Sequence, residues 1–160
     1  MTDFGALLTT LSRNKVEFMV IGGAAALAHG SARLTQDLDI LYERSPENLA
    51  RLVAAFKDTK PYLRGAPPGL PFLWDQATLA RGINFTLKTS LGDIDLLGEM
   101  TGGGTYQDLK AGAITLTVFQ TQCLCLSLQQ LIRAKRATGR PKDLEALAEL
   151  EAILEEDHLP

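Results

Sequence analysis

Two short segments carry aspartates two positions apart among apolar residues: Asp37 and Asp39 in DLDILY, and Asp93 and Asp95 in DIDLL. In a β-strand, residues i and i+2 share a face about 6.6 Å apart, so each pair places two carboxylates side by side. If the two strands meet, carboxylates roughly 7 Å apart repel by about 2 kcal/mol at an effective dielectric constant near 20. A divalent cation relieves that repulsion, and carboxylate oxygens favour Mg²⁺ or Mn²⁺ over zinc. The pattern predicts a metal site, and a solvated strand face is the alternative for either pair alone.

A glycine pair, Gly22-Gly23, follows an apolar, β-branched run and precedes a segment rich in alanine. Glycines at such a junction let backbone N–H groups at a helix N-terminus approach an anion closely, and the helix dipole favours the anion. We therefore interpret the pair as a phosphate cradle. The alternative is a tight turn between a strand and a helix with no ligand.

Basic residues are concentrated near the C-terminus and are followed by a mostly acidic stretch over residues 145–157. The cluster comprises Arg133, Lys135, Arg136, Arg140 and Lys142. Lysine and arginine suit phosphate, so the cluster could hold a triphosphate or an RNA end. The alternative is a solvated helix end that faces Glu145 and Glu149. Arg33, which precedes the first aspartate pair, carries the same two interpretations.

Composition excludes several classes of protein. The chain has 160 residues, 46% of them apolar, which predicts one folded core rather than disorder. A net charge of −3 does not favour broad adhesion to nucleic acid, and no apolar run is long enough to cross a bilayer. The N-terminus lacks a basic segment followed by a long apolar stretch, so we expect a cytoplasmic location and no membrane partner. Cys123 and Cys125 are expected to be buried thiols.

Residue patterns predict the elements that must position these groups. Helices are expected over residues 4–14, 24–29 and 46–56, from Ser127 onward and after Pro141, the last with an apolar stripe of Leu144, Leu147, Leu150 and Leu154. Strands are expected over residues 16–21, 37–42, 83–89, 93–97, 114–119 and 122–126. Residues 58–82, rich in proline, are expected to form an irregular loop with a short helical turn at residues 76–79. Ser45 and Ser127 are expected to cap helices.

The run GGAAALAHGSARLTQDLDI, residues 22–40, resembles the signature of the nucleotidyltransferase superfamily related to DNA polymerase β, in its small bacterial branch. DIDLL resembles the later strand that supplies that family's third acid. The closing run SLQQLIRAKRATGRPKDLEALAEL is similar to the C-terminal helices of AbiEii-type abortive-infection toxins and their relatives. The resemblance implies an α/β (α+β) fold with a mixed, mostly antiparallel sheet. A nucleotidyltransferase-like palm would span residues 1–126, and a C-terminal helical pair would span residues 127–160.

The same resemblance implies a role for each matching residue. Asp37, Asp39 and Asp95 would be the catalytic, metal-binding carboxylates, with Asp93 as a substitute for Asp95. The nucleotide would be held by Gly22, Gly23, Arg33, Lys135 and Lys142. Position 23 is glycine where many relatives have serine, so this chain lacks that hydroxyl, and a length of 160 residues leaves little room for an extra acceptor-binding domain.

The implied function is transfer of a nucleoside monophosphate from an NTP to a hydroxyl, with release of pyrophosphate and dependence on Mg²⁺ or Mn²⁺. The acceptor could be an RNA end, a protein or a small molecule. One alternative is a catalytically silent module that binds nucleotide or a partner, such as an antitoxin in a toxin–antitoxin pair. A dinucleotide-binding unit is a further alternative, but residues 22–27 do not match G-x-G-x-x-G and that reading leaves both aspartate pairs unexplained.

Overall fold

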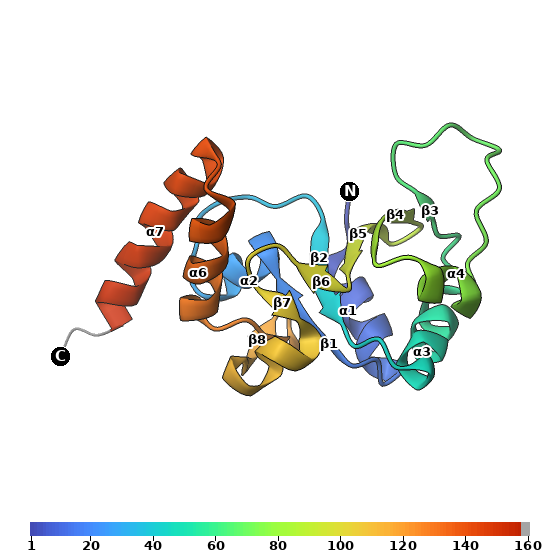
Figure 1. Cartoon of the computed structure of the whole chain (residues 1–160), viewed down its shortest axis with the longest axis horizontal. Helices are drawn as coiled ribbons and strands as arrows, with labels where there is room; N and C mark the ends of the chain where they lie inside the picture. Colours follow the sequence, from blue (N-terminus) through green and yellow to red (C-terminus); the bar gives the residue numbers. More distant parts are fainter. Residues whose placement is uncertain (158–160) are drawn as a thin grey trace.

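A seven-stranded sheet runs through the molecule in the computed structural model, which describes residues 1–157 (Figure 1). In spatial order its strands are β3 (Tyr62–Leu63), β4 (Asn84–Thr89), β5 (Gly92–Leu97), β2 (Leu38–Tyr42), β1 (Phe18–Ile21), β9 (Thr121–Cys125) and β8 (Ile114–Val118). β2 pairs with β5 and β1 with β9 in parallel, and the other four neighbouring pairs are antiparallel. The expected mixed, mostly antiparallel sheet is therefore confirmed.

Helices pack against this sheet and also lie at both ends of the molecule. They are α1 (Phe4–Arg13), α2 (Gly22–Ala28), α3 (Pro46–Phe56), α4 (Gln76–Arg81), α5 (Tyr106–Leu109), α6 (Leu128–Thr138) and α7 (Pro141–Asp157). Helix α1 packs against α3, while α2 contacts β1, β2 and β8. Helices α6 and α7 lie side by side at one end of the molecule, with α3 and α4 at the other (Figure 1). No helix within residues 1–157 is long and apolar enough to cross a membrane.

Side chains from the sheet and the helices share one hydrophobic core. Ile40 on β2 and Ile94 on β5 are fully buried, as is Leu8 on α1. Leu131 and Ile132 on α6 belong to the same cluster, so the C-terminal helices are anchored on the sheet through their apolar side chains. Burying a leucine or isoleucine side chain contributes about 1.5–3 kcal/mol, which fixes these elements relative to the strands.

Local signals in the sequence begin the helices where expected. The Ser45 side chain accepts a hydrogen bond from the N–H of Asn48 at the start of α3. Ser127 and Gln130 form a capping box at the start of α6. These bonds satisfy N–H groups that have no partner within a helix, so both ends are fixed. Cys123 and Cys125 are buried and free, as predicted.

Three features differ from the sequence-based expectation. Residues 58–82 contain the two-residue strand β3, which pairs with β4 and is too short to show alternation. Residues 99–109, for which no element was predicted, form a small hairpin, β6 (Glu99–Met100) with β7 (Gly104–Thr105), followed by α5. The apolar stripe of α7 is only partly buried: Leu150 is 1% exposed, but Leu144 is 55% exposed because it faces away from α6 and the sheet.

Candidate active site

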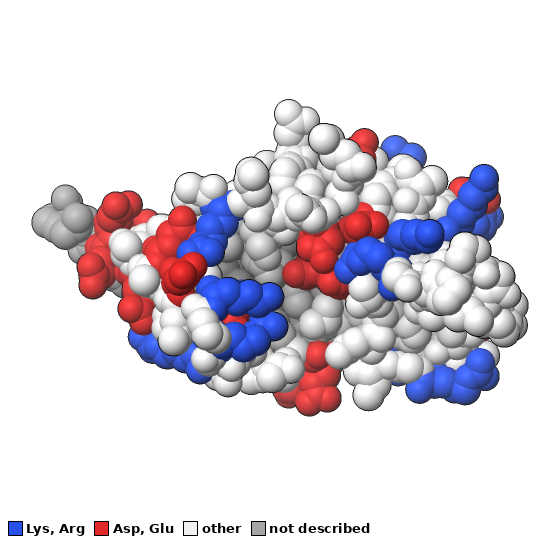
Figure 2. Space-filling view, turned by 90° about the horizontal axis from the view of Figure 1, so that it is seen from above, with Lys and Arg blue, Asp and Glu red and all other residues white. Residues whose placement is uncertain are grey.

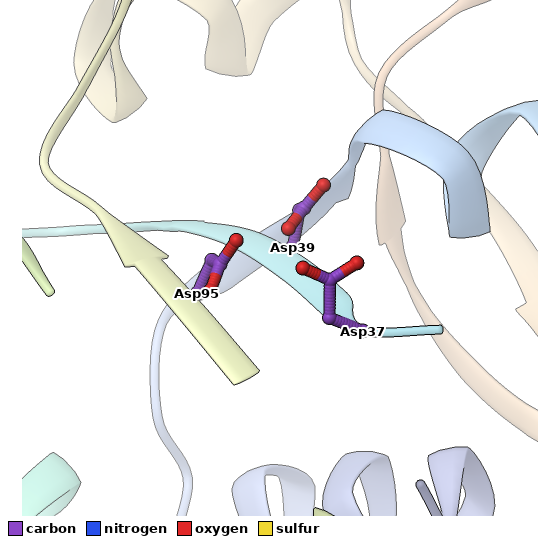
Figure 3. A group of neighbouring side chains, drawn as sticks. All are labelled: Asp37, Asp39 and Asp95. Atoms are coloured by element: carbon purple, nitrogen blue, oxygen red, sulfur yellow. The ribbon is translucent and has the colours of Figure 1, made fainter. Parts of the chain in front are cut away.

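Three carboxylates converge at the parallel junction of β2 and β5. Asp39 lies directly opposite Asp95 in the β2–β5 pairing, and Asp37 immediately precedes β2 on the same face as Asp39. One oxygen from each of Asp37, Asp39 and Asp95 lies within 4.8 Å of the other two. Figure 3 shows the three side chains pointing toward one another from the two strands. The predicted grouping of these residues is what the structure shows.

Asp39 is the most strongly perturbed member of this trio. Burial, a hydrogen bond with Asp95 and the charges of Asp37 and Asp95 raise the pKa of Asp39 from 3.8 to about 8, against a lowering by Arg64. The pKa of Asp37 is also raised, first by burial and then by Asp95. Asp39 Oδ1 is buried and has no hydrogen-bond partner within the described residues. A buried carboxylate oxygen without a partner is costly, so this oxygen calls for a cation or a proton.

The trio fits a hard divalent cation. One oxygen from each of the three carboxylates lies within 4.8 Å of the other two, so a single cation placed among them would be within reach of all three side chains. The donor set consists of carboxylate oxygens without sulfur or imidazole, which suits Mg²⁺ or Mn²⁺ rather than zinc. Asp37, Asp39 and Asp95 would be the ligands.

The glycine pair brings backbone into direct contact with this cluster. Gly22 starts α2 with φ +62°, and a Cβ atom there would lie 2.3 Å from Asp39 Oδ2. A Cβ atom at Gly23 would lie 2.6 Å from Thr35 Oγ1. Only glycine lets the turn approach so closely, because any side chain at either position would overlap with these oxygens. At position 23 the space of a side chain is filled by the Thr35 hydroxyl, whose sequence neighbourhood gave no sign of this contact.

Opposite the carboxylates, basic side chains line the same cleft, whose volume is about 520 Å³. They come from the segment before β2 and from α6, α7 and their connection, and they are Arg33, Lys135, Arg140 and Lys142. Figure 2 shows Lys and Arg side chains on one side of a hollow and acidic side chains on the other. The cleft therefore has a cationic wall and an anionic wall, with the glycine turn also in its lining.

A buried acid holds two of these cations in place. The side chain of Asp143 is 2% exposed and contacts Lys135 Nζ at 3.3 Å and Arg140 Nε at 2.7 Å. Hydrogen bonds from Arg140, and then from Thr138 and Lys135, keep the pKa of Asp143 well below its ordinary range. Arg33 lies 3.7 Å from Glu149, which also accepts a hydrogen bond from Ser31. Lys135 and Arg140 are thus paired with Asp143, while Glu145 and Glu149 both lie near Arg33, at 3.8 and 3.7 Å.

All eight residues to which the resemblance gave a catalytic or nucleotide-binding role line this one cleft, whereas Arg133 and Arg136 of the basic cluster do not. The eight are Gly22, Gly23, Arg33, Asp37, Asp39, Asp95, Lys135 and Lys142. Asp93 is not part of the metal-binding trio: its side chain is 41% exposed and lies at the outer side of the cluster. The structure places the eight residues of the list together, and the role of each one is a prediction.

Sequence reasoning missed Arg64, which enters the carboxylate cluster from the end of β3. Arg64 Nη2 lies 2.5 Å from Asp95 Oδ1 and 3.3 Å from Asp37 Oδ2. No sequence signal could identify it, because a single arginine in a proline-rich segment has no periodicity and its partners are about 30 residues away.

Comparison with known proteins gives information on the fold. No family model matches the sequence, and no curated protein matches it. Among solved structures, TM1012 of Thermotoga maritima, a candidate nucleotidyltransferase, is 17% identical with a TM-score of 0.56, covering 89% of this chain and 86% of that one. The lincosamide antibiotic adenylyltransferase LnuA, solved with lincomycin, is 15% identical with a TM-score of 0.53, covering 89% and 90%.

A third similar structure is an antigenic nucleotidyltransferase-like protein from Paracoccidioides brasiliensis. It is 16% identical with a TM-score of 0.53, and the match covers 91% of this chain and 72% of that one. At such low identity these likenesses establish that the chain has the fold of nucleotidyltransferases. The more specific resemblance to AbiEii-type proteins is not tested by them.

Proposed function

We propose that this nucleotidyltransferase-like chain transfers a nucleoside monophosphate from an NTP to a hydroxyl acceptor, with dependence on a divalent metal and release of pyrophosphate. The observation that carries the proposal is the cleft itself, in which three converging carboxylates face four basic side chains across a glycine turn. An NTP needs both walls, because its phosphates are anionic and its reacting phosphorus must meet a metal-binding group.

The carboxylate wall would serve the reacting centre. Asp37 and Asp39 would hold Mg²⁺ or Mn²⁺, and Asp95 would complete the ligand set on the side of the attacking hydroxyl. When bound, the metal neutralises charge on the entering and leaving oxygens. The acceptor oxygen forms a bond to the α-phosphorus while the bond to the bridging oxygen of the β-phosphate breaks. The Asp95 carboxylate would accept the hydroxyl proton, and pyrophosphate would depart.

The basic wall would hold the triphosphate. Backbone N–H groups at Gly22 and Gly23 can approach phosphate oxygens because neither residue has a side chain. Lys135 and Lys142, with Arg33, would offset the phosphate charge from the other wall. Asp143 Oδ1 lies 3.3 Å from Lys135 Nζ and holds this side chain in the lining of the cleft. A cleft of about 520 Å³ lies within the usual range for small-ligand sites.

The alternatives have less support. A silent nucleotide-binding or antitoxin-binding module does not require three carboxylates in contact range, whereas transfer does. A dinucleotide-binding unit is contradicted by the mostly antiparallel sheet, since that class is built on a parallel sheet.

The test is incubation with each α-labelled NTP and Mg²⁺ or Mn²⁺, in separate arms with RNA, protein and small hydroxyl compounds as acceptors. We expect labelled acceptor and pyrophosphate in one arm. Asp37→Asn and Asp39→Asn should each lower the rate by at least about 100-fold, because loss of groups that merely support metal ligands already costs 10- to 100-fold. The exposed Asp58→Asn is the matched control. Equal labelling by the two site variants would refute the proposal, and metal-dependent NTP binding without pyrophosphate would favour the silent module.

A further inference from the structure

We propose that Arg64 competes with the metal for the carboxylate trio and that Asp93 is the partner to which it moves when the metal binds. Arg64 would thereby set how tightly the protein binds a divalent cation. This inference rests on the proposed metal site.

The guanidinium of Arg64 contacts two of the three carboxylates that would bind the metal. Nη2 lies 2.5 Å from Asp95 Oδ1 and 3.3 Å from Asp37 Oδ2, so one nitrogen bridges two of the three expected ligands. A guanidinium N–H and a metal ion both require carboxylate lone pairs, and two cations in the same small cluster repel each other. Binding of the metal therefore requires the guanidinium to withdraw.

The backbone of Arg64 is fixed, because its N–H donates to Thr86 O at 3.0 Å beside the β3–β4 pairing. Its guanidinium has one bond outside the trio, from Nη1 to Leu87 O at 3.1 Å, about which it can turn as Nη2 leaves the aspartates. The side chain is 26% exposed, so its outer edge faces solvent. Withdrawal of the guanidinium can therefore occur by side-chain rotation without moving the strand.

Asp93 offers the displaced guanidinium a carboxylate outside the trio. It lies two residues before Asp95 on the same face of β5 and is 41% exposed. Its Oδ2 already lies 3.9 Å from Arg64 Nη1, so a small rotation would shorten this contact as the others break. The two aspartates of β5 thus have different roles: Asp95 binds the metal, and Asp93 binds the guanidinium of Arg64 once it is displaced.

Arg64 also holds two members of the trio together before a metal binds, because its Nη2 contacts both Asp95 and Asp37. It is therefore a positioning residue: it holds these two carboxylates near each other, and it gives way to a stronger cation.

The test is titration of the full chain with Mn²⁺ in the absence of NTP, with free Mn²⁺ followed by electron paramagnetic resonance. Arg64→Met should bind Mn²⁺ at least about fivefold more tightly than the parent, which is the lower range of coupling between two competing ligands. Arg64→Gln, which keeps a polar side chain, should act in the same direction. Lys88→Met is the matched control, since Lys88 lies opposite Asp93 in the β4–β5 pairing and lies over the ring of Tyr62. It removes the same charge nearby and should change the affinity by less than about threefold.

A double-variant cycle tests the role of Asp93. Asp93→Asn should weaken Mn²⁺ binding in the parent, because the displaced arginine loses its partner, and should have a smaller effect when combined with Arg64→Met. If Arg64→Met and Arg64→Gln fold, by circular dichroism, and bind Mn²⁺ no more tightly than Lys88→Met does, the inference is wrong. If the parent transfers nucleotide while that occurs, the proposed function survives alone. If neither the parent nor any folded variant binds Mn²⁺, the metal site itself is refuted.

Discussion

Replacing Asp39 with asparagine is expected to stabilise the folded protein at neutral and alkaline pH while it removes metal binding. Asp39 lies beside Asp37 and Asp95, and its Oδ1 is buried without a hydrogen-bond partner within the described residues. Its pKa is raised to about 8, chiefly by burial, so ionisation of this group opposes folding. Asparagine has nearly the same shape and carries no charge.

The sign and size of the change in the free energy of unfolding follow from the linkage between proton binding and folding. The folded state binds the Asp39 proton more tightly than the unfolded state, so ionisation of Asp39 lowers the free energy of unfolding. This loss of stability is absent below pH 3.8, grows as the pH rises and is complete above about pH 8. Each pH unit in that window costs about 1.4 kcal/mol, which gives on the order of 4 kcal/mol at pH 7 as an upper limit. With a urea dependence of about 2 kcal/mol per molar, the unfolding midpoint should rise by about 1–2 M.

The assay is urea unfolding of the parent and Asp39→Asn in EDTA at pH 5 and pH 8. The advantage of the variant should be small at pH 5 and largest at pH 8. Asp58→Asn, an exposed change of the same chemistry, should shift the midpoint little at either pH. Adding Mg²⁺ should stabilise the parent and leave Asp39→Asn unchanged, because only the parent keeps the full ligand set. An advantage that is equal at both pH values would refute the reasoning, since it would not arise from ionisation.

Three further predictions concern the cleft wall around the glycine turn. Gly22→Ala should destabilise the protein by about 2 kcal/mol more than Gly65→Ala in urea unfolding, because both residues have positive φ but only position 22 places a Cβ atom against a carboxylate oxygen. Equal losses would rule out this contact as the reason for the glycine. Gly23→Ser should cost about 1–3 kcal/mol by overlap, and adding Thr35→Gly should recover most of that loss; additive losses would contradict the overlap. Lys135→Met should weaken NTP binding about tenfold by calorimetry with Mg²⁺ present, and unchanged affinity would remove this residue from the phosphate wall.

The sequence predicted the local geometry of the site because that geometry depends on short periods. Alternation put Asp37 and Asp39 on one face of a strand, and the glycine pair marked the strand-to-helix junction beside them. Both follow from backbone rules that act over two or three residues. The side-by-side placement of Asp39 and Asp95 was different in kind, because only the resemblance, and not the spacing, indicated that their strands meet.

The parts that sequence reasoning missed depend on distant partners or on weak signals. Arg64 reaches the aspartates through the pairing of β3 with β4, and a two-residue edge strand leaves no alternation to detect. Leu144 fits the helical period of α7 but is exposed, because one face of α7 packs on α6 and the period alone does not say how wide that face is. Helix α5 had a detectable signal: Thr105 and Asp108 form a capping box with the T-x-x-D spacing.

In the described part of the chain, basic and acidic side chains line the same cleft without contacting each other across it, although opposite charges attract. Asp143 accounts for this on the basic wall: its buried carboxylate holds Lys135 at 3.3 Å and Arg140 at 2.7 Å, so both cations have a fixed partner on their own side. Arg64 accounts for it on the acidic wall by contacting Asp37 and Asp95. Each wall is thus partly neutralised from within and keeps a net charge: four basic side chains stand beside Asp143 and Glu149 on one side, and three carboxylates beside Arg64 on the other. A triphosphate with its metal carries both charges in the order that the two walls demand, so it can bind each wall without requiring the walls to close on each other.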